Sequence, residues 1–415
     1  MQFREATLDN GLEVVAECND RAYATGMAFF VKTGSRDESS ENFGVSHFLE
    51  HMVFKGTPRR TADDVNRELD EIGSHSNAFT SEERTVYYTT ILPEYQDRAI
   101  DLLSDILRPS LREDDFNTEK QVIVEEIYKY DDMPPFGAHE KCMAAFFGSH
   151  PLGQNVLGSV ESVTALTPEK MRAYFDERYS PGNITLVASG DVDFDRLVEA
   201  TDRWCGNWTN FKTDRNERPA SPQQGFLVFK NEQAFQQYVV QITQGPSTTD
   251  PDRYAARLLA TIIGDDSGSR FYWDLVETGR AEYAAMGTHE FQGAGIFMTY
   301  LCCDPQLADS NLDATQMILA DVESKGITAA ELEQAQNKMC AQIVLASERS
   351  GNRLFTVGSS WTQRREYRPV KEVLAAYRDV TLDDIHAVLT KYPLTNNTTV
   401  AVGPLNKLCG VNCSS

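Results

Sequence analysis

The stretch Asn42-Phe-Gly-Val-Ser-His47-Phe-Leu-Glu50-His51-Met-Val-Phe-Lys-Gly-Thr57 contains the most informative spacing in the chain. We expect a short helix here, with Ser46 near its start and Gly56 at its C-terminal end. Because residues four apart share a helix face, His47 and His51 can direct two imidazole nitrogens to one ion. The spacing therefore predicts a zinc site.

Glu50 follows His47 by three residues and directly precedes His51. This position places its carboxylate near the ion without making it a ligand, as is typical of the general base for an activated water. The order His-x-x-Glu-His inverts the commoner zinc signature and is a catalytic motif in its own right. A surface helix with a salt-bridged face is the alternative interpretation.

Two histidines leave a catalytic zinc one protein ligand short. The segment 113–130 has the pattern of an amphipathic helix with acidic residues in its first turn. Glu119 and Glu126 lie two turns apart on one stripe, with Val122 between them, which favours a buried carboxylate with a partner. Glu126 is the expected third ligand, although the spacing alone leaves Glu125 as an alternative.

The chain of 415 residues is long enough for two domains. Residues 209–225 are polar, contain two prolines and lack periodic apolar positions, so we expect a linker there. The expected domains are residues 1–208, which contain the metal motif, and residues 226–415.

The two halves end with similar sequence patterns. In each half a capped helical stretch is followed by β-prone residues, at 183–190 in the first and 397–403 in the second. This similarity favours an internal duplication. Strands are expected at 11–16, 25–32, 85–92, 226–229, 238–243 and 295–302. Helices are expected at 45–54, 62–72, 94–106, 113–130 and 168–179. The pattern indicates the α+β class, with two similar sandwich-like domains of sheet and helices.

The formal net charge of −23 disfavours nucleic acid and anionic membranes as partners, because both bind basic surfaces. An acidic cavity would attract basic peptides, although the charge is equally consistent with solubility alone. No apolar run is long enough to span a bilayer. The first residues lack a secretory pattern, so we expect a cytoplasmic location, or an organelle matrix after removal of a presequence.

The eight cysteines are scattered without the paired short spacings of a structural zinc module. Free thiols in a reducing compartment fit this pattern. Cys409 and Cys413 are expected to be inert, because no second pair accompanies them.

These motifs give the chain a resemblance to the pitrilysin-type metallopeptidases, closest to the branch of mitochondrial processing peptidase and its bacterial relatives. The resemblance covers nearly the whole chain. It is carried by Leu8-Asp-Asn-Gly-Leu, the stretches 34–38, 44–57 and 77–88, Glu119-Lys-Gln-Val-Ile-Val-Glu-Glu126 and His150-Pro-Leu-Gly153.

The resemblance implies one zinc ion per chain, with His47, His51 and Glu126 as ligands. It selects Glu126 over Glu125, and it implies Glu50 as the base and Glu119 as an acidic residue that supports the site. It also places Asn77 and Ala78 on a strand whose edge pairs with the substrate backbone. A simple turn role is the alternative for Asn77.

Relatives carry an arginine and a tyrosine seven residues apart that contact the substrate. Here the tyrosine position is Tyr283, but the arginine position holds Val276. Arg280 is a possible substitute one turn away; otherwise Tyr283 acts alone or a partner chain supplies the pair. An ordinary buried aromatic role for Tyr283 is equally consistent with the sequence.

The resemblance finally implies a zinc endopeptidase that hydrolyses unfolded peptides inside a chamber formed by two chains, as a homodimer or with a related subunit. The alternative is a noncatalytic or partner-dependent subunit that serves as a scaffold or as the zinc half of a two-chain peptidase.

Overall fold

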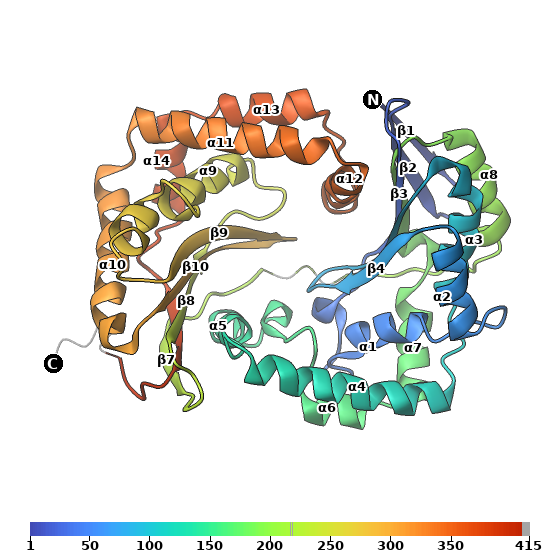
Figure 1. Cartoon of the computed structure of the whole chain (residues 1–415), viewed down its shortest axis with the longest axis horizontal. Helices are drawn as coiled ribbons and strands as arrows, with labels where there is room; N and C mark the ends of the chain where they lie inside the picture. Colours follow the sequence, from blue (N-terminus) through green and yellow to red (C-terminus); the bar gives the residue numbers. More distant parts are fainter. Residues whose placement is uncertain (216, 218, 409–415) are drawn as a thin grey trace. The chain divides into compact units, whose positions relative to one another are not determined.

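The computed structural model describes residues 1–215, 217 and 219–408 (Figure 1). Cys409 and Cys413, which we expect to be inert, lie outside the described residues. Within the described ranges, no helix combines the length and the apolar character needed to cross a membrane.

The strands are β1 (Gln2–Thr7), β2 (Glu13–Cys18), β3 (Thr25–Val31), β4 (His75–Thr80), β5 (Thr85–Ile91), β6 (Ile184–Gly190), β7 (Phe226–Lys230), β8 (Gln237–Gln244), β9 (Tyr283–Phe291), β10 (Ala294–Cys303) and β11 (Thr398–Gly403). The α-helices are α1 (Val45–Val53), α2 (Ala62–Glu71), α3 (Gln96–Ile106), α4 (Glu113–Asp132), α5 (Ala138–Phe147), α6 (Val160–Ala165), α7 (Pro168–Arg178), α8 (Phe194–Cys205), α9 (Arg253–Gly264), α10 (Ala308–Lys325), α11 (Ala329–Ser347), α12 (Ser350–Arg364), α13 (Val370–Arg378) and α14 (Leu382–Lys391). Every strand and helix expected from the pattern is present.

The first sheet has the order β1-β2-β6-β3-β5-β4, with β2 and β6 parallel and the other neighbours antiparallel. Strand β3 is buried at every position, because helices cover both faces of the sheet. Met27 and Phe29 pack into the main core with residues of α1 and α3. Ala28 and Phe30 point to the other face and pack with residues of α12. The alternation of side chains along the strand produces this division.

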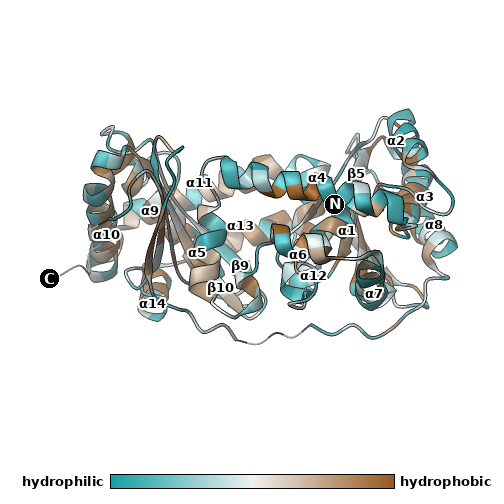
Figure 2. Cartoon of the chain, turned by 90° about the horizontal axis from the view of Figure 1, so that it is seen from below, coloured by the Kyte–Doolittle hydropathy of each residue, from teal (hydrophilic) through white to brown (hydrophobic). Residues whose placement is uncertain are grey.

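The second sheet has the order β7-β11-β8-β10-β9. Its parallel pair is β7 with β11, and its other neighbours are antiparallel. Strands β2 to β6 of the first sheet therefore correspond one to one, in chain order and in direction, to β7 to β11 of the second. In Figure 2 the strands of the second sheet are mainly hydrophobic, whereas helix α10 mixes hydrophilic and hydrophobic residues. The matching topologies support the expected duplication and the two-domain α+β architecture.

The chain forms two compact units, and each unit is discontinuous in sequence. Unit 1 comprises residues 1–128, 154–216 and 345–368, and unit 2 comprises residues 129–153, 217–344 and 369–415. Helix α5 of the first half thus belongs to the unit of the second sheet, and α12 of the second half belongs to the unit of the first. The domain ranges expected from the sequence, 1–208 and 226–415, assign each helix to its own half of the chain, so they do not describe this exchange of α5 and α12 between the units. They remain predictions. The described residues of the expected linker 209–225 contain no helix or strand.

A buried ion network fixes the segment that leads into α1. Asp37 pairs with Arg178 at 2.8 Å and with Arg215 at 2.5 Å. Its neighbour Arg36 pairs with Glu83 at 2.6 Å. Because these side chains are almost fully enclosed, removal of one partner would leave an uncompensated buried charge. The network therefore holds the loop between β3 and α1 in place.

Candidate metal centre

Helix α1 carries both histidines of the motif on one face. It starts after Gly44, which has φ of +87°, and the carboxyl group of Glu38 accepts hydrogen bonds from its first turn. Glu38 accepts hydrogen bonds from the backbone N–H groups of Gly44 and Ser46, both at 2.8 Å. The rings of His47 and His51 lie 4.7 Å apart between their centroids. The spacing of four residues therefore places the two imidazole rings side by side on the helix, as expected.

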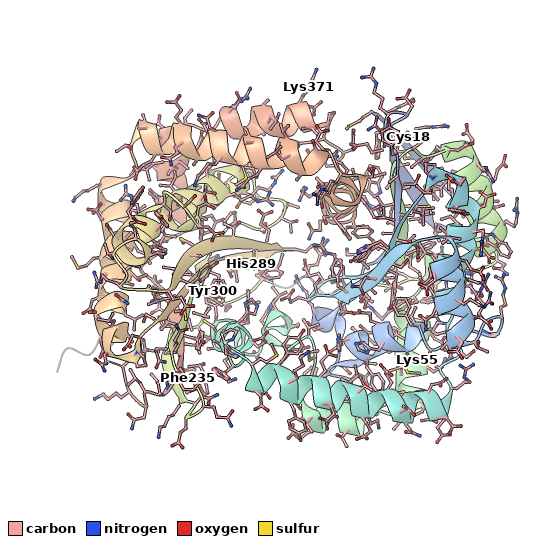
Figure 3. All side chains as sticks on the ribbon, in the orientation of Figure 1. Cys18, Lys55, Phe235, His289, Tyr300 and Lys371 are labelled. Carbon is pink, nitrogen blue, oxygen red and sulfur yellow. The ribbon has the colours of Figure 1, made fainter. Side chains whose placement is uncertain are left out.

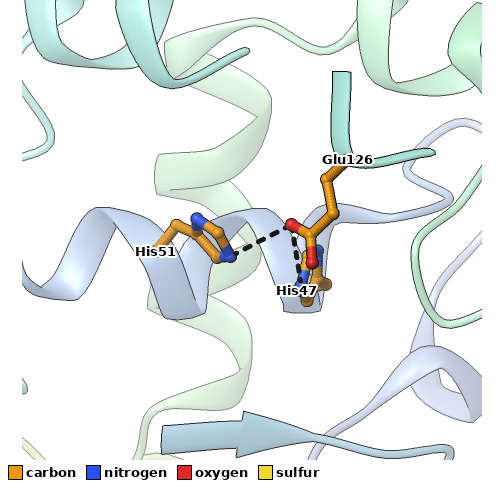
Figure 4. A group of neighbouring side chains, drawn as sticks. All are labelled: His47, His51 and Glu126. Atoms are coloured by element: carbon orange, nitrogen blue, oxygen red, sulfur yellow. Dashed lines mark ion pairs between the residues drawn. The ribbon is translucent and has the colours of Figure 1, made fainter. Parts of the chain in front are cut away.

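Helix α4 brings Glu126 to the two histidines (Figure 4). Glu126 Oε2 lies 3.8 Å from Nε2 of His47 and 3.6 Å from Nε2 of His51. One ligand atom from each residue lies within 4.8 Å of the others. Tetrahedral zinc ligands with bonds of about 2.0–2.2 Å lie about 3.3–3.6 Å apart, so this donor set fits zinc with small adjustments. Glu125 is exposed and is not part of the group.

Glu119 orients His51 from the side opposite to Glu126. Its Oε1 lies 2.9 Å from Nδ1 of His51, and its Oε2 lies 2.5 Å from Nζ of Lys55, which Figure 3 labels. When Nδ1 donates to Glu119, the lone pair of Nε2 is available toward Glu126. This contact favours the tautomer in which Nδ1 carries the proton and Nε2 is the ligand nitrogen.

The electrostatic environment differs between the histidines. Burial, together with the neighbouring His51, lowers the pKa of His47 to about 3, which keeps its imidazole neutral. His47 Nδ1 is buried and has no hydrogen-bond partner among the described residues. Burial also opposes the charged form of His51, but the hydrogen bond to Glu119 and the nearby carboxylates outweigh it and raise the pKa of His51.

Glu50 lies on α1 between the histidines and is mostly buried. Its Oε2 accepts a 2.6 Å hydrogen bond from the hydroxyl of Thr80, the last residue of β4. Burial raises the pKa of the Glu50 carboxyl, and the Thr80 hydrogen bond and His51 oppose this effect. A partly desolvated carboxylate close to the histidines has the chemistry of a proton acceptor.

Asn77 and Ala78 lie on β4, which is an edge strand because it pairs only with β5 in the sheet order. Asn77 is exposed, and its Oδ1 accepts a 2.9 Å hydrogen bond from the backbone N–H of Ala78. The pattern of apolar residues does not predict this strand; only the family resemblance does.

Tyr283 and Arg280 belong to unit 2, whereas the metal-binding group belongs to unit 1. Tyr283 begins the edge strand β9, and 48% of its surface is exposed. Arg280 donates to the backbone carbonyl of Ser310 at 2.9 Å. Val276 packs partly buried against the core of unit 2. The exposed position of Tyr283 does not fit an ordinary buried aromatic.

Sequence reasoning gave no role to Lys55, Thr80 or Glu38, although all three contact the candidate centre or its helix. Lys55 follows His51 by four residues on the same chain segment, and this spacing is the signal that could have identified it. Thr80 and Glu38 act across elements, so no local spacing indicates their contacts.

Two family models match the chain in consecutive segments. The model described as Insulinase (Peptidase family M16) matches residues 13–160, which include the whole candidate centre. The model described as Peptidase M16 inactive domain matches residues 165–339.

Curated relatives align along almost the entire chain. A protein of Mycobacterium tuberculosis named as an uncharacterized zinc protease is 31% identical over 395 residues, which are 93% of this chain and 89% of the relative. A protein of Arabidopsis thaliana named as a probable mitochondrial-processing peptidase subunit beta is 27% identical over 429 residues, which are 99% of this chain and 80% of the relative.

Solved structures share the fold. A protease from Helicobacter pylori matches with a TM-score of 0.90 at 21% identity, over 97% of this chain and 99% of that one. A peptidase M16 inactive domain from Pseudomonas fluorescens matches with a TM-score of 0.89 at 17% identity, over 99% of this chain and 100% of that one. With the matching family models and the relatives above 30% identity, these findings show that the chain belongs to the insulinase (M16) family of peptidases.

Proposed function

We propose that this chain is a zinc-dependent endopeptidase that hydrolyses unfolded peptides. The observation that carries the proposal is the convergence of His47, His51 and Glu126 from two helices, with the carboxylate of Glu50 beside them. The names of the curated zinc proteases support the same activity.

The proposed ligands are His47, His51 and Glu126, one zinc ion per chain. When bound there, zinc would acidify a water molecule and polarise the peptide carbonyl. Glu119 holds the ring of His51 through Nδ1, so the other nitrogen stays directed toward the ion. The protein therefore supplies a fixed donor set that needs little reorganisation.

Glu50 is the proposed general base. Its carboxylate accepts the proton of the attacking water and then delivers that proton to the nitrogen of the leaving amine. The Thr80 hydrogen bond occupies Oε2, which leaves Oε1 to take the proton. The burial of Glu50 favours this role, because a desolvated carboxylate is a stronger base than one in water.

The outer edge of β4 is the proposed binding site for the substrate backbone. An extended peptide can add to an exposed strand edge through main-chain hydrogen bonds, which suits unfolded substrates of varied sequence. Asn77 and Ala78 are the proposed contacts. For peptide pairing, the Ala78 N–H would exchange its bond to the Asn77 side chain for one to the substrate.

Tyr283 is proposed to stabilise the oxyanion that forms during attack, and Arg280 to contact the substrate. The exposed hydroxyl-bearing side chain of Tyr283 supports this proposal. We further propose a dimer, either of two identical chains or with a related subunit, and a cytoplasmic location. Light scattering of the purified chain that detects only monomers at all concentrations would contradict the dimer.

The substitution Glu50→Gln tests the proposed general base directly. Glu50→Gln removes the proton acceptor but retains the side-chain volume and leaves all three proposed ligands in place. We expect zinc content to stay at one per chain and cleavage of a quenched peptide to fall about 10²-fold or more. Zinc is measured by inductively coupled plasma spectrometry, and cleavage by fluorescence.

The matched control for this experiment is Glu125→Gln, which removes an equal charge from an exposed position one residue before Glu126. This variant should keep both zinc and activity. A Glu50→Gln enzyme with undiminished cleavage would disprove the role of Glu50.

A partner-dependent zinc subunit is the second candidate function, and Val276 at the expected arginine position favours it. This candidate predicts zinc binding without cleavage by the chain alone, and cleavage once a co-purifying partner is added. Cleavage by the isolated chain at the rate of the complex would exclude it.

A further inference from the structure

We propose that Thr80 is a positioning residue that holds the carboxylate of Glu50 and couples this base to the strand that binds the substrate. This inference rests on the proposed function. It concerns a hydroxyl with no assigned role, at the end of β4. Its hydrogen bond to Glu50 is 2.6 Å long.

The contact is specific. Among the described residues, Thr80 is the only hydrogen-bond partner of the Glu50 side chain. Hydrogen bonds from a hydroxyl to an oxygen acceptor are about 2.5–3.0 Å long. The observed length lies at the short end of this range, so the contact restrains the position of the Glu50 carboxyl group.

Strand pairing fixes the position of Thr80. Its Cα partner on β5 is Thr85, which is buried and donates to the carbonyl of Thr33 at 3.0 Å. The contact between the hydroxyls of Thr80 and Thr85 is 3.4 Å and is much weaker than the bond to Glu50. The hairpin of β4 and β5 therefore fixes the position of the Thr80 hydroxyl, and the stronger of its two hydrogen bonds is the one to Glu50.

The alternation along β4 directs Thr80 toward α1. Ala78, two residues earlier, packs against the core that contains the apolar side chains of α1. Phe79 points to the opposite face and packs with residues of α12. Because residues i and i+2 of a strand share a face, Ala78 and Thr80 both face the metal-site helix.

The same strand thus carries two functions. Its outer edge, at Asn77 and Ala78, is the proposed position of the substrate backbone, and its last residue holds the base. A peptide that pairs with this edge would restrain β4 and, through Thr80, the carboxylate of Glu50. Loss of the hydroxyl should therefore impair the chemical step more than substrate binding.

Thr80→Val tests this proposal, because valine keeps the β-branched shape and the strand preference but cannot donate. With zinc-loaded full chain and a quenched peptide, we expect kcat to fall about 10-fold. KM, the zinc Kd and the melting temperature should stay close to wild type. Thr80→Ser, which keeps the hydroxyl, should restore kcat to within about threefold of wild type.

Ser76→Ala is the matched control. Ser76 lies on the same face of β4, and its hydroxyl bridges to Thr89 of β5 at 2.8 Å without touching Glu50. Equal losses of kcat in Ser76→Ala and Thr80→Val would indicate a purely structural role of the hairpin and overturn the proposal. Unchanged kcat in Thr80→Val, or failure of serine to restore it, would overturn it as well.

A second readout does not depend on activity. In crystal structures of the zinc-loaded variants, we expect Glu50 to occupy several rotamers in Thr80→Val and a single one in Thr80→Ser. A single wild-type rotamer of Glu50 in Thr80→Val would overturn the positioning role. Absence of cleavage by the wild-type enzyme, alone or with its partner, would instead contradict the proposed function, so the two failures are distinguishable.

Discussion

The carboxylate of Glu119 contacts two side chains at once, with His51 on one oxygen and Lys55 on the other. Glu119→Gln keeps a possible acceptor for His51, but it removes the charge that pairs with Lys55. Residues that hold a ligand in orientation typically change metal affinity about 10- to 100-fold when replaced. We therefore expect the zinc Kd to rise at least about 10-fold, as measured by competition with a chromophoric chelator.

The control for this prediction is again Glu125→Gln, which carries the same change on the same helix at an exposed position. Its zinc Kd should equal that of wild type. If both variants bind zinc as tightly as the wild-type chain, Glu119 does not orient His51 in the way the contact suggests.

The sequence alone could identify those site residues that one helix brings together through its periodicity. His47 and His51 are four apart, and the helix alone sets them side by side. Glu126 was one of two candidates by spacing, since α4 could have presented either carboxylate; packing of α4 exposes Glu125 instead. The contact between Thr80 and Glu50 joins a strand end to a helix, so only the tertiary fold produces it.

At the scale of elements, α12 packs closely on the first sheet. A Cβ at Gly358 would overlap the ring of Phe30, so the absence of a side chain permits this approach. Gly358→Ala should destabilise the protein by about 1–3 kcal/mol, as overpacking of a core does, although alanine favours a helix. Urea unfolding followed by circular dichroism measures the change.

Gly351→Ala is the matched control on the same helix. A Cβ there would meet only Thr90 Oγ1 at 3.7 Å, an ordinary contact. Helix propensity should make this variant as stable as wild type or more stable by up to about 1 kcal/mol. Equal effects of the two substitutions would show that α12 does not pack on β3 in solution as described.

Elements with a clear apolar pattern were predictable, and elements without one were not. Strand β3 reads Thr-Gly-Met-Ala-Phe-Phe-Val and is buried on both faces. Strand β4 reads His-Ser-Asn-Ala-Phe-Thr and lies at an edge, where polar residues are tolerated and no alternation identifies a strand. The exchange of α5 and α12 between the units could not be predicted from the sequence either. Periodicity shows that a helix has an apolar face, but it does not show which sheet that face packs against.

At the scale of the whole molecule, the duplicated halves have diverged at the candidate centre. Helix α9 follows β8 as α1 follows β3, so the two helices occupy equivalent places in the two topologies. Helix α9 reads Arg-Tyr-Ala-Ala-Arg-Leu-Leu-Ala-Thr-Ile-Ile-Gly and contains no histidine, cysteine or carboxylate. Helix α9 therefore lacks the donors that α1 carries at the equivalent place, in agreement with the inactive-domain model that matches residues 165–339.

The second half carries a partly buried histidine, His289, from which we predict a pH-dependent contribution to stability. Figure 3 labels His289 of β9 and Tyr300 of β10. His289 faces His139 of α5, with ring centroids 6.1 Å apart, and Nδ1 of His139 lies 2.8 Å from the hydroxyl of Tyr300. Burial, aided by His139, lowers the pKa of His289 to about 4. The folded state thus favours the neutral form, whereas the unfolded state takes up a proton below about pH 6.5.

Because the unfolded state binds more protons between about pH 6.5 and 4, the contribution of His289 to stability is present above this range and decreases as the pH falls through it. His289→Gln should therefore lose less unfolding free energy between pH 7 and pH 5 than the wild-type chain does. Urea titrations at both pH values measure this difference. The exposed His386, replaced in the same way, serves as the control and should leave the pH dependence of wild type unchanged. If His289→Gln and His386→Gln show the same pH dependence, the neutral form of His289 does not stabilise the fold.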